Sequence, residues 1–178
     1  MDADSHVTSY GYDTNGDLTS VTPPLGRQTQ WGYKGLGVKT SRTDALGRLT
    51  TYTLDGWNRV TTVTYPDSST KTVSYDANSN VTGFTDGTGT TSRTYDAANR
   101  LTSLTNKNSS ATVLSSFGHG YNSDDKRTSC TEATGDVVSY GYDRLLHLSS
   151  ESRTGTNAYT ALYVVDGVGN RTSSTVGG

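Results

Sequence analysis

The chain has 178 residues, a formal net charge of −2 and only 30% hydrophobic residues, and its mean hydropathy is −0.63. This composition argues against a thick two-layer core, while twelve tyrosines at recurring places and a charged fraction of 18% argue against disorder. The near-neutral charge without a lysine or arginine cluster argues against nucleic-acid binding. No apolar run reaches the ~20 residues of a membrane-spanning helix, and residues 1–10 do not resemble a secretory signal.

The first element is the phrase Tyr12–Thr19, in which Tyr-Asp is followed by two spacers, Gly, a polar residue, an aliphatic residue and Thr. Tyr95–Thr102 repeats it closely, and degraded copies lie between and after. The interval is about 21 residues, as between Asp55 and Asp76. A fixed period of this size indicates one supersecondary unit that must stack on its neighbours. The aspartate place is taken in turn by Asp13, Lys34 (degenerate), Asp55, Asp76, Asp96, Asn122, Asp143 and Asp166.

Each phrase predicts a hairpin corner. The aspartate can accept hydrogen bonds from backbone N–H groups a few residues on, as in an Asx turn. Three positions later comes a residue that tolerates a left-handed backbone, and the aliphatic-Thr pair then restarts a strand. The left-handed places are Gly16, Gly47, Asn58, Asn99 and Gly169.

A second corner falls ten or eleven residues after the first, and two corners mean two short strands per repeat. We therefore expect an all-β fold of roughly sixteen strands: tandem antiparallel hairpins in a long strip that curls or spirals, because flat sheets of this extent are unusual. The second corners are Pro23–Gly26, Asp44–Gly47, Tyr65–Asp67 and Asp86–Gly89.

The tyrosines predict how the strip is held together. If the register holds, they form a ladder on one face and supply cross-strand contacts that replace a core. One spacing is at odds with strict alternation: Leu101 and Leu104, like Val60 and Val63, are three residues apart. Either a bulge separates them or both faces carry apolar cover. The ladder positions are Tyr12, Tyr33, Tyr75, Tyr95, Tyr121 and Tyr142.

Few residues suggest a catalytic or metal site. Asp13–Asp17 and Asp76–Asn80 place oxygen ligands at alternate positions, as calcium loops do, but an EF-hand counted from Asp13 would need Glu at Pro24. Because Asp, Asn and Gly are also the residues that favour turns, the same sequences are explained without a metal, and we expect no metal and no cofactor. The histidines, His6, His119 and His147, are far apart and are expected to be exposed turn or strand residues.

The remaining chemical candidates have plain structural interpretations. The lone Cys130 is expected to be a small strand residue. Gly87–Thr90 lacks the lysine and helix of a phosphate loop and is expected to be a turn. Exposed rings such as Trp31 and Trp57 could stack on sugars or protein partners, although membership of the ladder is favoured. Arg48, Arg59 and Arg100 are expected to pair with neighbouring aspartates or carbonyls rather than to form a binding site.

The phrase resembles the YD repeat of Rhs proteins over almost the whole chain. The same repeat occurs in the B and C components of insecticidal toxin complexes, in wall-associated contact-inhibition toxins and in teneurins. The residues that carry the resemblance are Tyr12, Asp13, Gly16, Asp44, Gly47, Arg48, Asp55, Asn58, Arg59, Tyr75, Asp76, Tyr95, Asp96, Asn99, Arg100, Tyr142, Asp143, Asp166 and Gly169.

The resemblance implies a spiralling sheet that, in complete members, winds into a hollow shell around a toxin domain. We expect residues 1–178 to be one array of about eight repeats, too short to enclose a cavity, and without the Asp-Pro motif of self-cleavage. The expected function is a non-catalytic scaffold, extracellular or at the cell surface, a fragment of a shell or a unit that stacks into a fibre. Its partners would be further repeats or copies of itself at open sheet edges, a toxin domain or a surface glycan. The alternative is a carbohydrate-binding fibre or adhesin that uses exposed Tyr and Trp.

Overall fold

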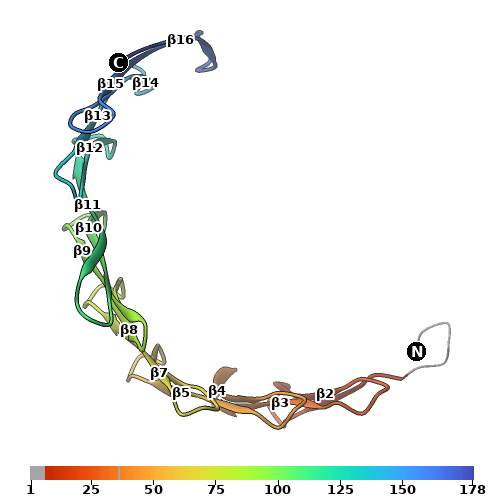
Figure 1. Cartoon of the computed structure of the whole chain (residues 1–178). Helices are drawn as coiled ribbons and strands as arrows, with labels where there is room; N and C mark the ends of the chain where they lie inside the picture. The colour runs from red at the N-terminus through yellow and green to blue at the C-terminus, as the bar shows by residue number, and fades with distance from the viewer. Residues whose placement is uncertain (1–6, 36) are drawn as a thin grey trace. The chain divides into compact units, whose positions relative to one another are not determined.

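The computed structural model describes residues 7–35 and 37–178. In this part of the chain the strands form one 16-stranded antiparallel sheet whose order follows the sequence (Figure 1), which confirms the predicted all-β fold and the number of strands. His6 lies outside the described residues. The strands are β1 (Ser9–Tyr12), β2 (Leu18–Thr22), β3 (Thr29–Lys34), β4 (Val38–Thr43), β5 (Leu49–Leu54), β6 (Val60–Thr64), β7 (Thr70–Tyr75), β8 (Val81–Asp86), β9 (Gly89–Tyr95), β10 (Leu101–Asn108), β11 (Val113–Tyr121), β12 (Arg127–Glu132), β13 (Val137–Tyr142), β14 (Leu148–Arg153), β15 (Tyr159–Val165) and β16 (Arg171–Gly177).

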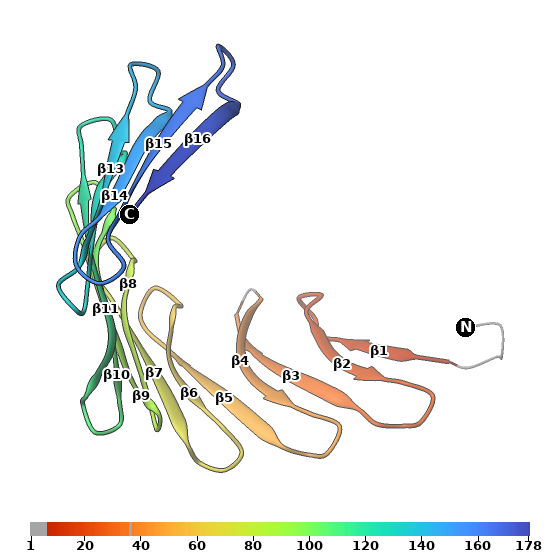
Figure 2. The same cartoon turned by 45° about the horizontal axis from the view of Figure 1, so that its top comes forward.

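The chain packs as two compact units. The first runs to Ser74 and includes Phe84–Gly87, and the second comprises Tyr75–Gly83 and Thr88–Gly178. Within each unit, consecutive strands are joined by tight hairpins, as Figure 2 shows for β3 to β6 and for β13 to β16. We call the turns after odd-numbered strands the odd turns and the others the even turns. Because successive strands run in opposite directions, all odd turns of a unit lie at one end of its strands.

A bulge next to most odd turns sets which residues share a face. Leu101 pairs with Tyr95, but the next pair is Ser103 with Thr94, so Thr102 is the extra residue. Pairing in β5 and β6 likewise skips Thr61. A bulge places residues three apart on the same side. Of the two explanations for the Leu101 and Leu104 spacing, the structure shows the bulge.

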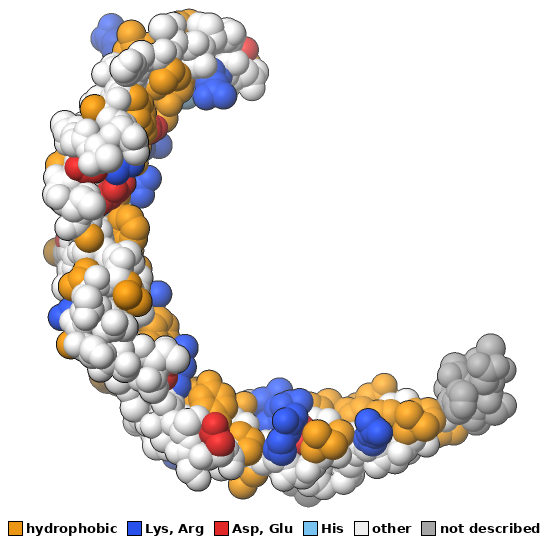
Figure 3. Space-filling model, viewed as in Figure 1, with side chains coloured by type: hydrophobic (Ala, Val, Ile, Leu, Met, Phe, Trp, Pro, Cys, Tyr) orange, Lys and Arg blue, Asp and Glu red, His pale blue; other side chains and the backbone are white. Residues whose placement is uncertain are grey.

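The register separates two faces of different chemistry. Directly opposite residues project to the same side, and on one side the pairs join rings, aliphatic chains and cations, such as Trp31 with Arg42 and Leu104 with Phe117. We call this side the aromatic face. The other side, the hydroxyl face, pairs small residues, such as Gly32 with Ser41. In Figure 3 the hydrophobic, lysine and arginine side chains of the first unit gather along its upper side, and other residue types dominate below.

The tyrosine ladder differs in detail from the prediction. Tyrosines on odd strands do share one face, but each lies opposite a residue of another kind: Tyr33 opposite Lys39, Tyr95 opposite Leu101 and Tyr142 opposite Leu148. The ladder therefore alternates rings with aliphatic or cationic chains. At Tyr95 and Tyr142 the bulge brings the first residue after the turn opposite the tyrosine.

A conventional core is missing from the described residues. Within residues 7–35 and 37–178, the buried hydrophobic side chains are Cys130, Val138 and Ala161, which are 8%, 8% and 2% exposed. Internal strands such as β6 and β14 instead leave their side chains half-buried between those of their two neighbours. Stability therefore depends on cross-strand contacts and hydrogen bonds, summed between adjacent repeats.

Gly89 should be intolerant of a side chain. Its φ is +152°, and an added Cβ would overlap the carbonyl oxygen of Lys107 on β10. Because that obstacle is backbone, Gly89→Ala should lower the free energy of unfolding by about 1–3 kcal/mol, measured by urea denaturation with circular dichroism. Gly87→Ala, whose Cβ would meet nothing within 4 Å, is the control. Equal stability of the two variants would contradict this account of the β8–β9 turn.

Candidate functional site: the odd turns and their contacts

In most odd turns the side-chain oxygen of an Asp or Asn at the start of the turn organises the backbone. At Asp55 the backbone N–H donates to the Arg59 carbonyl at 2.9 Å, and Asn58 N–H donates to the Asp55 carbonyl at 3.1 Å. Asn58 is left-handed, with φ 61°. Asp55 Oδ1 accepts the N–H groups of Trp57 and Arg59 at 2.9 and 3.0 Å. The same pair of bonds to one side-chain oxygen recurs at Asp13, Asp44, Asp76, Asp96, Asn108, Asn122, Asp143 and Asp166.

This turn is not confined to the odd turns. Asp44, one of the best-preserved copies of the phrase, lies in an even turn with the same geometry, and Asn108 provides another example. The two asparagines, Asn108 and Asn122, show that a neutral side-chain oxygen can replace the carboxylate, and Tyr65 begins a turn with the same two backbone bonds. The sequence motif therefore predicts a tight turn but does not by itself indicate whether that turn is an odd turn or an even turn.

The three predicted arginine pairings are present. Arg48 Nη2 lies 2.6 Å from Asp44 Oδ2, and Arg59 and Arg100 reach Asp55 and Asp96 at 2.7 Å. The guanidinium and the backbone N–H of Arg48 lower the pKa of Asp44 to about 2. In Asp96 the backbone N–H of Arg100 and then its guanidinium lower the pKa of the carboxyl. The arginines thus stabilise the ionised turn.

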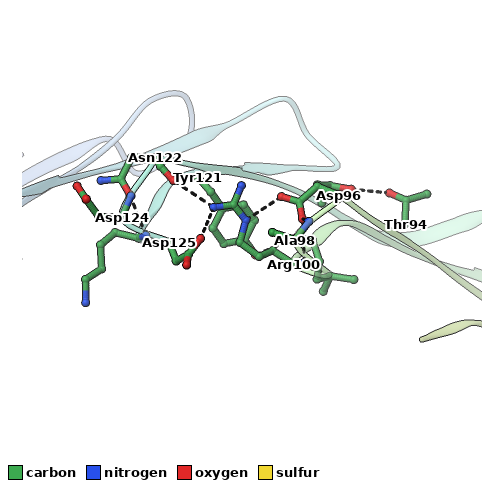
Figure 4. Close-up of polar contacts among 11 residues, drawn as sticks. Thr94, Asp96, Ala98, Arg100, Tyr121, Asn122, Asp124 and Asp125 are labelled. Atoms are coloured by element: carbon green, nitrogen blue, oxygen red, sulfur yellow. Dashed lines mark hydrogen bonds and ion pairs between the residues drawn. The ribbon is translucent and has the colours of Figure 1, made fainter. Parts of the chain in front are cut away.

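The fifth residue of an odd turn also contacts the next odd turn. Arg100 Nη1 donates to the Asn122 carbonyl at 3.1 Å and to Asp125 Oδ1 at 2.6 Å, while its guanidinium covers the Tyr121 ring at 4.7 Å (Figure 4). Other residue types do the same in other repeats. Asn80 Nδ2 donates to Asn99 Oδ1 at 2.8 Å, and Asp17 Oδ2 accepts the Gly37 N–H at 2.9 Å.

The tyrosine before the turn makes a second link between repeats. Its hydroxyl donates to the carbonyl of the first residue after the preceding odd turn: Tyr33 to Leu18 at 2.8 Å, Tyr95 to Val81 at 2.9 Å, Tyr121 to Leu101 at 2.8 Å and Tyr142 to Arg127 at 2.8 Å. This role was missed from the sequence, where the tyrosines were interpreted through their rings. The sequence held a signal for this role: a phenylalanine ring would pack equally well, so the regular use of tyrosine before the turn indicates that the hydroxyl is needed.

A second contact set that the sequence did not reveal lies in the second unit. Arg153 Nη2 donates to Glu132 Oε2 at 2.7 Å and to Asp136 Oδ2 at 3.0 Å, and the first of the effects that lower the Asp136 pKa is this bond to Arg153. Next to it the Tyr159 hydroxyl donates to the Glu151 carboxylate, which with burial raises the pKa of Tyr159 to about 12. None of these residues belongs to the repeated phrase, so no periodic signal marked them.

The predicted calcium-like loops are turns in the structure. Asp13 Oδ1 and Asp17 Oδ2 accept backbone N–H groups, and both Asp76 oxygens accept hydrogen bonds from within its own turn. The described residues contain no group of three or more His, Cys, Asp or Glu placed to hold a metal. Gly87 and Thr88 form the β8–β9 turn, as expected.

The expectation of exposed histidines was wrong for the two that the structure describes. His119 is half-buried opposite Cys130, its Nδ1 is buried without a hydrogen-bond partner, and burial lowers its pKa. His147 occupies the fifth turn position, with Nδ1 3.1 Å from Asp143 Oδ2. Cys130 is a buried strand residue whose pKa is raised by burial.

The two tryptophans differ. Trp31 is half-buried with Lys39 above its ring at 5.4 Å, whereas Trp57 is 69% exposed and has Arg59 over one ring face at 4.6 Å. The described part of the chain has no helix of the length and apolarity that crossing a membrane requires.

Removing one inter-repeat hydroxyl should measure the strength of that link. Tyr121→Phe keeps the ring beneath Arg100 but loses the bond to the Leu101 carbonyl, so we expect a loss of about 0.5–1.5 kcal/mol in unfolding free energy. Urea denaturation checks the value. Tyr52→Phe, in which the lost hydroxyl has no such carbonyl partner among the described residues, is the control and should change little. The idea fails if both variants behave alike.

Acid should weaken the turns. Because the folded state lowers the pKa of Asp44, Asp96 and Asp143, these carboxyls stabilise the fold above the unfolded-chain pKa of about 4. That stabilisation is lost as the pH falls from about 4 toward about 2. Denaturation midpoints recorded across this range should fall. Asp44→Asn, which keeps the acceptor oxygen, should show a smaller fall than the parent chain; a parallel fall would count against the ion pairs.

A comparison with protein families places the repeats. The family model described as RHS Repeat matches residues 12–37, 40–70 and 75–111, more than half of the chain. No curated protein matches the sequence.

Among solved structures, the crystal structure of TcdB2-TccC3-TEV aligns with a TM-score of 0.73 at 16% identity, over 94% of this chain and 11% of that chain. TcdB2-TccC3 without its hypervariable C-terminal region gives 0.61 at 16% identity, over 96% and 10%. A variant of the Photorhabdus luminescens Tc holotoxin pore gives 0.59 at 16% identity, over 89% and 10%. The chain thus spans about a tenth of the length of these structures, and at this identity the likeness concerns the fold. The family model matches more than half of the chain, in the segments that carry the repeated phrase, and this shows that the chain belongs to the RHS repeat family.

Proposed function

We propose that the chain is a non-catalytic wall segment of an Rhs-type β-shell that encapsulates or presents a toxin effector. The observation that carries this proposal is the open sheet of consecutive hairpins, each stabilised by its neighbours, which aligns along most of its length with about a tenth of TcdB2-TccC3-TEV. The hydrogen-bonded corners and the cation-covered rings are structural contacts between repeats. They provide a wall and no converging set of reactive groups.

The proposed partners follow from the same architecture. Within the described chain, β1 and β16 each have one neighbouring strand, and such strands are templates for pairing. Further Rhs repeats or second copies of this chain would complete them, and a toxin domain would be the enclosed cargo. The proposed location is extracellular or at the cell surface, where Rhs-type shells act.

A surface-binding fibre is the second candidate because of one observation. Trp57 is 69% exposed in an odd turn, and Arg59 covers only one face of its ring. A ring so placed on a rigid sheet could stack on a sugar.

The shell proposal is tested on the complete product of the gene that carries this segment. Protease treatment followed by electron microscopy should show a protease-resistant, β-rich particle that releases a protected C-terminal fragment only after denaturation. A product without further repeats or a protected fragment would overturn the proposal.

A glycan array separates the two candidates. The shell proposal expects no sugar-specific binding by the chain. Binding that Trp57→Ala abolishes, while Trp31→Ala leaves the fold and binding intact, would instead support the adhesin.

A further inference from the structure

The first strand presents an unused copy of the inter-repeat link. Tyr12 precedes the odd turn at Asp13 as Tyr121 precedes the turn at Asn122, yet it is 62% exposed, and among the described residues its hydroxyl has no hydrogen-bond partner. Tyr121, its internal counterpart, is half-buried and donates to Leu101. Tyr10 on the same strand is 58% exposed. β1 therefore shows the side chains that an odd strand normally places against a preceding even strand.

The last strand presents the complementary half. Arg171 follows the turn Asp166–Asn170 as Leu101 follows the turn Asp96–Arg100, so its carbonyl occupies the place that accepts a tyrosine hydroxyl elsewhere. β16 is exposed along its whole length. Asn170 stands at the fifth turn position, from which Asn80 and Arg100 reach the next odd turn.

We propose that β1 of one copy of this chain docks on β16 of a second copy in the register of the internal repeats, with the Tyr12 hydroxyl donating to the Arg171 carbonyl. The interface continues the chain's own repeat-to-repeat interface, which is the reason to name a second copy as the occupant. An unrelated strand could pair with the backbone, but it would lack the bulge and the turn that bring this carbonyl within reach. The contact joins two different surfaces, so it generates head-to-tail assemblies, as rings or open filaments, rather than two-fold symmetric dimers.

This docking rests on the proposed scaffold function. It specifies the partner, a second copy of the chain, and the register in which the two edge strands pair. The first test is sedimentation of the 178-residue chain over a concentration series. We expect concentration-dependent association that Tyr12→Phe weakens roughly three- to tenfold, the range for one hydrogen bond. Tyr52→Phe removes a hydroxyl from the internal strand β5 and should leave association unchanged.

A gain-of-association variant guards against trivial misfolding. Asn170→Arg should place a guanidinium over Tyr12 of the neighbouring copy, as Arg100 covers Tyr121 at 4.7 Å, and strengthen association about two- to fivefold. The gain should vanish when Tyr12→Ala is added. Lys126→Arg, at the same position of an internal odd turn, is the matched control and should have no effect.

The outcomes separate this docking from the scaffold itself. A chain that stays monomeric, or association that responds equally to the Tyr12 and Tyr52 changes, would overturn the docking. Neither result touches the protected fragment and the further repeats by which the shell proposal is judged.

Discussion

The structure depends on one local interaction, the acceptance of two backbone N–H groups by a side-chain oxygen at the start of a five-residue turn. It reverses the chain at a fixed place. The fourth residue of the turn then has a left-handed backbone, a conformation that Gly and Asn adopt at the lowest energetic cost. Asn108 and Asn122 satisfy the turn without a charge, so the turn does not depend on a negative side chain. The arginine pairs of Asp44 and Asp96 add stabilisation to a corner that is already determined.

The corner has consequences beyond itself because a bulge follows it. The extra residue, Thr102 in one repeat, brings Leu101 opposite Tyr95 and keeps Leu104 on the same side. Rings, aliphatic chains and cations then gather on the aromatic face, and Gly, Ser and Thr on the hydroxyl face. With few buried side chains, the sheet is stabilised between neighbours, as in other repeat proteins. The tyrosine hydroxyls and the fifth turn residues make those neighbour contacts directional.

A protein built this way presents an extended sheet of consecutive hairpins. Its membership of the RHS repeat family and its likeness to a small part of TcdB2-TccC3 structures agree with that. The contacts that could be taken for chemistry, such as Arg100 between Asp96 and Asp125, are accounted for by the joining of one turn to the next. Each repeat contacts the next one in the same way, and this is what allows further repeats to be added to the array.

The sequence alone determined the repeat, the all-β class, the corners and the arginine pairs, because Asx turns, left-handed Gly or Asn and ion pairs four residues apart are local. It left open whether Leu101 and Leu104 share a face, and it missed the bond from Tyr121 to Leu101 and the Arg153 cluster. Those contacts join residues about 20 positions apart in the sequence. A bulge shifts the strand register by one residue, and the alternation of apolar and polar residues along a strand does not reveal such a shift. The half-burial of His119, which lies opposite Cys130 in the sheet, was likewise not visible in the sequence. Tertiary pairing, not local pattern, fixed which side chains meet.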